Sequence, residues 1–93
     1  RAIELKPSLA AAHSNLGNTL LAMGKTEAAI AALRSAVELN AGFPEAYNNL
    51  GIALASAGKL GEAVAAYGEA ISLRPEFAEA HTNLGNVFQA RGE

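Results

Sequence analysis

The sequence predicts an all-α fold, a right-handed α-solenoid in which antiparallel helix pairs stack side by side. Three observations support this prediction. The segments HSNLG, YNNLG and HTNLG begin at positions 13, 47 and 81, so they recur with a period of 34 residues. Glycines recur in register with them, at Gly17 and Gly24, Gly51 and Gly58, and Gly85 and Gly92. Apolar residues follow helical spacing within each period, which indicates a structural unit copied in tandem.

The composition favours a folded binding domain and excludes several other classes. The chain has 93 residues, of which 51% are hydrophobic and 17% charged, with a net charge of −2 and no cysteine. Disulfides and thiolate metal sites are therefore excluded, and the seven dispersed Lys and Arg residues argue against nucleic acid as a partner. No signal peptide and no apolar run of ~20 residues is present, and we expect no membrane insertion. These absences leave the compartment open, with a cytoplasmic location favoured. The chain begins inside a repeat, and we expect it to be part of a longer protein.

Each unit reads as two helices, which we name A and B. Residues 1–9 are predicted to hold the end of a preceding B helix, closed near Pro7, and a turn. Repeat 1 covers 10–43, with an A helix at about 10–23 and a B helix at about 26–39. In the A helix, Leu16, Leu20 and Met23 are spaced by four and three residues, as in a helical stripe. Gly24 is expected to close that helix in a left-handed conformation.

The second and third units repeat this organisation. Repeat 2 covers 44–77, with an A helix at about 44–57 that starts on Pro44, a favoured first helical position. Its B helix is expected at about 60–73 and ends before Pro75. Repeat 3 covers 78–93 and contains only an A helix, at about 78–91. The sequence therefore predicts a single domain of about two and a half helix pairs.

The repeated residues resemble the tetratricopeptide repeat, a helix–turn–helix unit of 34 residues. The second unit carries the pattern in full: Tyr47, Leu50, Gly51, Gly58, Ala63, Tyr67, Ala70 and Pro75. Two departures are His13 and His81, which replace the large aromatic residue of the pattern. We interpret both histidines as packing residues. Gly68 lies inside a predicted helix and should cost roughly 1 kcal/mol relative to alanine.

The resemblance implies that one side of the A helices lines a concave groove, and a helical wheel shows which residues share that side. The candidate groove residues are Ala11, Ser14, Asn15, Asn18, Glu45, Asn48, Asn49, Ile52, Glu79, Thr82, Asn83 and Asn86. Asn15, Asn49 and Asn83 would form a row of amides, and an amide can pair with both the N–H and the C=O of an extended peptide. This row is similar to the asparagine ladder of O-linked N-acetylglucosamine transferases. Inheritance from a duplicated ancestor is the alternative explanation of the row, and it requires no function.

We therefore expect a protein–protein interaction scaffold that binds an extended peptide segment of another protein. The alternatives are a substrate-recruiting segment of a larger enzyme, such as a glycosyltransferase, and a purely structural oligomerisation element. Self-association is also expected, because the last A helix has apolar residues that no following B helix covers.

The sequence offers no catalytic residues, no metal site and no cofactor site. The two histidines are two units apart, and no Ser or Thr has a plausible base beside it. Some tetratricopeptide domains hold the acidic C-terminus of a chaperone through Lys and Arg. Here Ser14, Glu79 and Asn83 occupy the matching positions, so we expect no such carboxylate clamp.

Overall fold

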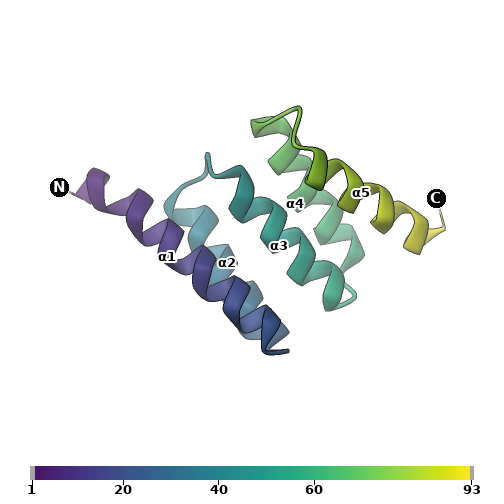
Figure 1. The fold of residues 1–93 in the computed structure, drawn as a ribbon, viewed down its shortest axis with the longest axis horizontal. Helices are drawn as coiled ribbons and strands as arrows, with labels where there is room; N and C mark the ends of the chain where they lie inside the picture. Colours follow the sequence, from purple (N-terminus) through teal and green to yellow (C-terminus); the bar gives the residue numbers. More distant parts are fainter. Residues whose placement is uncertain (1, 93) are drawn as a thin grey trace.

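The computed structural model describes residues 2–92, with side chains described from Ser8 onward. The described residues form five helices, α1 (Ala2–Ala22), α2 (Thr26–Leu39), α3 (Pro44–Ser56), α4 (Leu60–Leu73) and α5 (Ala78–Arg91). Figure 1 shows α1 with α2 and α3 with α4 as antiparallel pairs, followed by α5. The predicted all-α stack of about two and a half helix pairs is confirmed.

The helix boundaries match the prediction except at the first helix. The two B helices, α2 and α4, have the predicted bounds, and α3 ends one residue early. The predicted break near Pro7 is wrong, because α1 runs without interruption from Ala2 to Ala22. In the complete units, the break lets both helices pack against neighbours, whereas the first turns of α1 extend beyond α2 (Figure 1). Proline inside a helix removes one backbone donor and ordinarily costs about 3 kcal/mol, which is the reason that a break was expected there.

Glycine closes the A helices in the predicted way. Gly24 and Gly58 have φ values of +81° and +80°, a left-handed conformation that an L side chain rarely adopts. The N–H of Lys25 donates to the carbonyl of Leu20 at 2.8 Å, and the Gly24 N–H donates to that of Leu21 at 3.0 Å. This pair of bonds is the Schellman motif, which satisfies carbonyls that the helix end would leave unpaired.

Each A helix packs closely on its B helix where a mid-helix glycine meets a large side chain. A Cβ added at Gly17 would lie 2.5 Å from Cγ of Leu33, and one added at Gly51 would lie 2.6 Å from Cε1 of Tyr67. The glycines therefore make room for the Leu33 and Tyr67 side chains. Gly85 has no atom within 4 Å of an added Cβ. The A helix α5 has no B partner at that position in the described chain.

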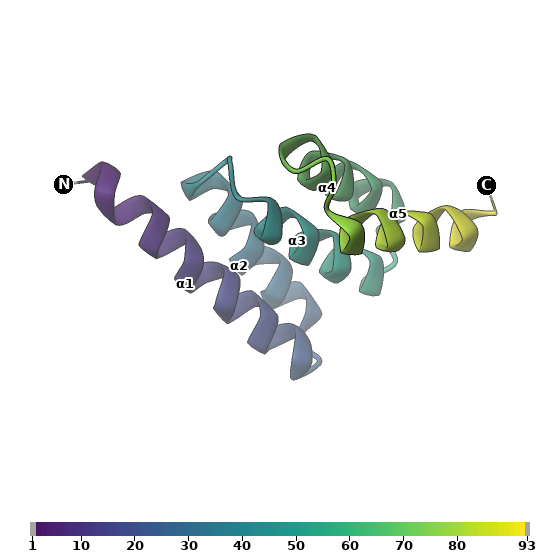
Figure 2. The ribbon, with the colours of Figure 1, turned by 45° about the horizontal axis from the view of Figure 1, so that its top comes forward.

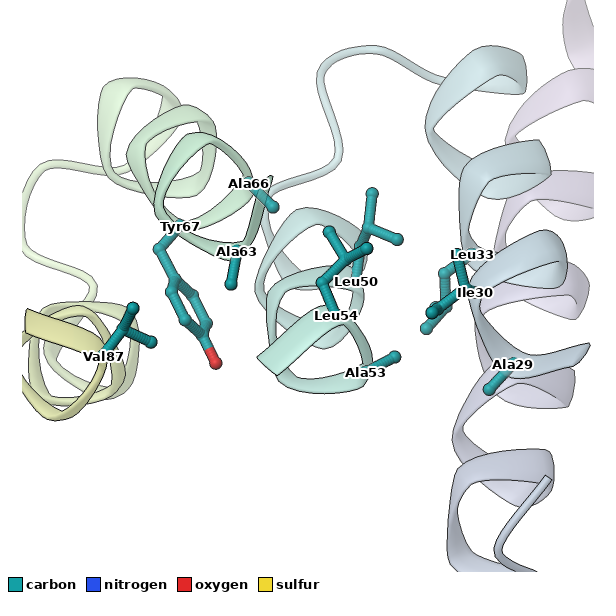
Figure 3. Packing of buried hydrophobic residues seen from close by; sticks show 10 residues of the cluster. All are labelled: Ala29, Ile30, Leu33, Leu50, Ala53, Leu54, Ala63, Ala66, Tyr67 and Val87. Atoms are coloured by element: carbon teal, nitrogen blue, oxygen red, sulfur yellow. The ribbon is translucent and has the colours of Figure 1, made fainter. Parts of the chain in front are cut away.

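The core continues from one pair to the next because each B helix also packs on the following A helix. The buried cluster contains Ala29, Ile30, Leu33, Leu50, Ala53, Leu54, Ala63, Ala66, Tyr67 and Val87. Figure 3 shows Leu50 and Leu54 of α3 between α2 on one side and α4 on the other, with Tyr67 lying between α3 and α5. Burial of each such large side chain contributes about 1.5–3 kcal/mol of hydrophobic free energy.

The stack has two different sides. The A helices α1, α3 and α5 contact each other in succession, whereas the backbones of α2 and α4 stay apart over the described residues and the Arg34–Glu62 salt bridge spans the space between them. Figure 2, in which the stack is turned, shows the A helices as one row and the B helices as another. We name these the A side and the B side. Within residues 2–92, no helix has the length and apolar character needed to span a membrane.

Candidate functional site

The twelve predicted groove residues lie on the three A helices but differ in exposure. Six are exposed: Ala11, Asn15, Asn18, Glu79, Thr82 and Asn86. Four are half-buried: Glu45, Asn49, Ile52 and Asn83. Ser14 and Asn48 are buried, with exposed fractions of 4% and 2%.

Burial of Ser14 and Asn48 contradicts the expectation that both line an open groove. Each faces the next A helix and accepts a hydrogen bond from it. The Asn49 Nδ2 donates to Ser14 Oγ at 3.4 Å, and the Asn83 Nδ2 donates to Asn48 Oδ1 at 3.2 Å. Since the wheel of a single helix ignores the neighbouring A helix, it could not distinguish these contact positions from groove positions.

These two bonds join α1 to α3 and α3 to α5 in the same way. In each bond the donor is the asparagine of an Asn-Leu-Gly triplet. The acceptor lies in the preceding unit, one residue before the asparagine of that unit's triplet. Two of the three repeated amides therefore already serve the packing of the stack. Each still has a second N–H, and Oδ1 of Asn49 and Asn83 accepts no described hydrogen bond. Asn15 is exposed, because no A helix precedes α1 in the described chain.

A hollow of about 420 Å³ lies between α3 and α5 on the A side. Its lining residues are Ile52, Ala55, Ser56, Leu60, Tyr67, Asn83, Asn86, Val87 and Ala90. Of the predicted groove residues it brings together Ile52, Asn83 and Asn86, while Thr82 and Glu79 lie outside its lining. We name it the inner hollow.

The apolar part of the inner hollow was missed from the sequence. Tyr67 and Val87 belong to the core by their helical spacing, and the wheel placed neither of them on the groove side. Both line the hollow where α4 and α5 meet beneath it. Burial raises the pKa of the Tyr67 phenol to about 12, and the negative charge of Glu79 contributes to the rise. The phenol is therefore neutral at physiological pH.

Glu45, a predicted groove residue, is already paired. Its carboxylate accepts a hydrogen bond from Nη2 of Arg74, which begins the loop after α4. This bond lowers the pKa of Glu45 below its ordinary value of 4.5. The Arg74 guanidinium also lies 4.8 Å from the centre of the Phe77 ring, a cation–π distance. The pair fixes the start of α3 to the loop that leads into α5.

The histidines take different roles in the two units. Nε2 of His81 lies 2.8 Å from the Pro75 carbonyl, to which it donates in one ring tautomer, and this bond ties α5 to the loop before it. The ring is exposed, so the expected packing role is wrong for His81. Within the described residues, no B helix follows α5 to supply a packing surface beside His81. His13 is half-buried. No group of three or more metal-ligating side chains is found within residues 2–92.

Two family models match the chain. The model described as "Tetratricopeptide repeat" matches residues 14–72, and the model described as "TPR repeat" matches residues 53–92. No curated protein sequence matches the chain.

Solved structures show the same arrangement of helices. A crystal structure of MamA is 34% identical, with a TM-score of 0.86 over 89% of this chain and 48% of that chain. A second MamA structure is 32% identical, with a TM-score of 0.87 over 97% of this chain and 49% of that chain. The first TPR of Spaghetti (RPAP3), bound to the HSP90 peptide SRMEEVD, is 27% identical, with a TM-score of 0.87 over 90% of this chain and 67% of that chain.

The chain thus spans about half the length of the two MamA chains. The 34-residue period, the glycine contacts between paired helices and the match over residues 14–72 all agree. This chain belongs to the tetratricopeptide repeat family.

Proposed function

We propose that this chain is a protein-interaction scaffold that binds an extended peptide on its A side, with one apolar side chain of the peptide in the inner hollow. The repeats themselves and the peptide bound to the similar Spaghetti domain support a scaffold of this kind. The observation on which this proposal mainly rests is the set of residues that line the inner hollow. Ile52, Tyr67 and Val87 form an apolar floor, and Asn83 and Asn86 supply amides beside it.

This composition suits a peptide backbone next to an apolar side chain. Amides pair with main-chain N–H and C=O groups whatever the peptide sequence, and the apolar floor selects the side chain between them. Neither Lys nor Arg lines the hollow. A free carboxylate would therefore find no cationic partner there, so an acidic tail such as SRMEEVD is a poor candidate ligand for this chain.

Asn86 provides the sharpest test, because Asn49 and Asn83 also hold the A helices together. The probes are Ac-Gly-Ser-Ala-Leu-Ala-Ser-Gly-amide, the same peptide with alanine in place of leucine, and SRMEEVD. Binding is followed by NMR shifts of the Asn83 and Asn86 side-chain NH₂ signals and of the Ile52 and Val87 methyl groups. We expect the leucine peptide to bind best and Asn86→Ala to weaken it by about 2- to 10-fold, the effect of one hydrogen bond.

Asn18→Ala is the matched control, since Asn18 occupies the same repeat position in α1 and is exposed away from the hollow. Equal weakening by Asn18→Ala and Asn86→Ala would remove the inner hollow from the proposal. Tighter binding of SRMEEVD than of the leucine peptide would contradict it as a whole.

We also propose that the isolated chain self-associates through its end helices. Leu9, Leu16 and Met23 lie seven residues apart on one face of α1, with exposed fractions of 48%, 49% and 60%. Of their counterparts Phe43, Leu50 and Ala57 one unit later, Leu50 is buried in the core cluster and Ala57 packs against it. Sedimentation over rising concentration should show association that Leu16→Glu reduces. A monomeric mass at high concentration would refute this proposal.

A further inference from the structure

A second hollow lies on the B side, where α2 and α4 leave a gap above α3. Its volume is about 330 Å³, and its lining residues are Arg34, Val37, Glu38, Tyr47, Leu50, Leu54, Glu62, Ala65, Ala66 and Glu69. The gap exists because the backbones of the two B helices stay apart over the described residues, and the Arg34–Glu62 salt bridge spans it. Figure 3 shows Leu50 and Leu54 on α3 between the two B helices. We name it the outer hollow.

The outer hollow has an apolar floor. Leu50 and Leu54 of α3 lie at its base, with Val37 from α2 and Ala66 from α4 beside them. The half-buried ring of Tyr47 adds an aromatic wall. An aliphatic chain laid on this surface would exclude water from apolar carbon on several sides.

The rim of the outer hollow is acidic. Its single cation, Arg34, donates to Glu62 Oε1 at 2.7 Å, and this bond lowers the pKa of Glu62. Neither Glu38 nor Glu69 forms an ion pair with any residue of the described chain. Burial raises the pKa of the Tyr47 phenol, and the negative charge of Glu69 raises it further. Glu69 and Tyr47 both line the outer hollow.

The acidic residues are not part of the repeated framework. Ala28 and Ser35 occupy the positions of Glu62 and Glu69 one unit earlier, and Ser72 occupies the position of Glu38 one unit later. Packing of the repeat therefore does not require these carboxylates.

We propose that the outer hollow binds a lysine or arginine side chain from a basic segment of a partner protein. Such a side chain lays its aliphatic stem on apolar surface while its charged end stays at the rim. Glu38 and Glu69 would accept from the cation, and the Tyr47 ring offers a cation–π contact. Phosphate and carboxylate groups would meet like charge at this rim, which excludes nucleic acid and acidic peptides as ligands of this site.

The test uses the full 93-residue chain, labelled with ¹⁵N and ¹³C, and four peptides of the form Ac-Ala-Ala-X-Ala-Ala-amide. X is lysine, norleucine, Nε-acetyl-lysine or glutamate. We expect the lysine peptide to shift the signals of Val37, Tyr47, Ala65 and Glu69. Binding should weaken as salt is added, because the rim charges are exposed to solvent. Norleucine and acetyl-lysine should bind more weakly, and glutamate should not bind.

The double variant Glu38→Gln/Glu69→Gln removes both unpaired carboxylates without changing side-chain size. We expect it to weaken the lysine peptide about fivefold, the effect of two exposed ion pairs. Glu27→Gln/Glu76→Gln is the matched control, since it changes the net charge equally at two exposed positions outside the outer hollow. Circular dichroism checks that both variants keep their helices.

Equal loss in the two double variants would overturn the proposal, because net charge alone would then explain binding. Shifts confined to Asn83 and Asn86 would also overturn it, since the lysine peptide would then occupy the inner hollow. Asn86→Ala provides the converse control: it should leave the response of the outer hollow unchanged even if it abolishes binding on the A side.

Discussion

Replacement of Gly51 by alanine tests one of the two tight contacts between paired helices. The new Cβ would lie 2.6, 2.7 and 2.9 Å from three ring carbons of Tyr67. That ring belongs to the buried cluster and is 2% exposed, so it cannot swing into solvent. Alanine in place of a mid-helix glycine gains about 1 kcal/mol of helix propensity. Overpacking in a filled core costs about 1–3 kcal/mol, and three overlapping ring atoms place this site near the upper end.

The expected net result for Gly51→Ala is a loss of about 2 kcal/mol in the free energy of unfolding. For a chain of this size, that loss lowers Tm by about 8–16 °C. Gly85→Ala makes the same exchange at the same repeat position, where nothing lies within 4 Å of the new Cβ. It should raise stability by up to about 1 kcal/mol. Thermal and urea unfolding, followed by circular dichroism at equal protein concentration, measure both variants.

The opposite signs are the essential result. If Gly51→Ala and Gly85→Ala both stabilise, the helices can separate at little cost and the steric explanation is wrong. Tyr67→Ala supplies a further check, because it removes the overlapping ring. In that background, Gly51→Ala should be neutral or stabilising. A destabilisation of unchanged size would show that the cost arises elsewhere than at the ring.

Three further predictions concern polar groups. Because the pKa of Tyr67 rises from 10 to about 12 on folding, the neutral phenol stabilises the fold fully below pH 10, and this contribution is lost as pH rises through 12. Unfolding at several pH values should therefore show the free energy of unfolding falling by about 2–3 kcal/mol over this range, and Tyr67→Phe should largely abolish the fall. Asn48→Ala should lower the free energy of unfolding by about 1–2 kcal/mol, because it removes the buried acceptor of the Asn83 hydrogen bond. Asn15→Ala, at an exposed position, should change it by less than about 0.5 kcal/mol. A similar loss for both variants in urea unfolding would contradict the role of Asn48 in linking α3 to α5. The pKa of Glu45 is lowered by Arg74, so that pair stabilises above pH 4.5 and its contribution is lost as pH falls further; both side chains are part-exposed, and Glu45→Gln should remove about 0–1 kcal/mol of acid sensitivity in Tm measured from pH 6 to pH 3.

The architecture could be predicted from the sequence because it depends on local signals repeated in register. Gly24 and Gly58 end helices for a steric reason that holds at each copy, and Gly17 and Gly51 mark where the paired helix comes closest. The break predicted at Pro7 is wrong. Its counterpart Ala41 lies in a turn with packed helices on both sides, whereas the first turns of α1 extend beyond α2 (Figure 1). The residues of a turn do not reveal whether helices pack on both sides of it.

The candidate site was less predictable for the same reason. A helical wheel assigns residues to sides of one helix, but Ser14 and Asn48 are decided by the neighbouring A helix. The two hollows depend on where helices diverge, and neither divergence is encoded in any single repeat. No sequence pattern distinguishes Glu38 and Glu69 from other exposed charges. The structure brings them together on the rim of the gap between α2 and α4.

The one-sided contact between units gives the stack an unequal resistance to bending. Hydrogen bonds from the Asn49 and Asn83 side chains join each A helix to the one before it, whereas the exposed Arg34–Glu62 salt bridge is the one described bond between α2 and α4. Spreading α2 from α4 would therefore break one solvent-exposed ion pair, which contributes little free energy, whereas spreading the A helices would break packing and hydrogen bonds between neighbours. Any guest wedged between α2 and α4 would change the curvature of the whole array, while the spacing offered to a peptide on the opposite side would stay nearly constant.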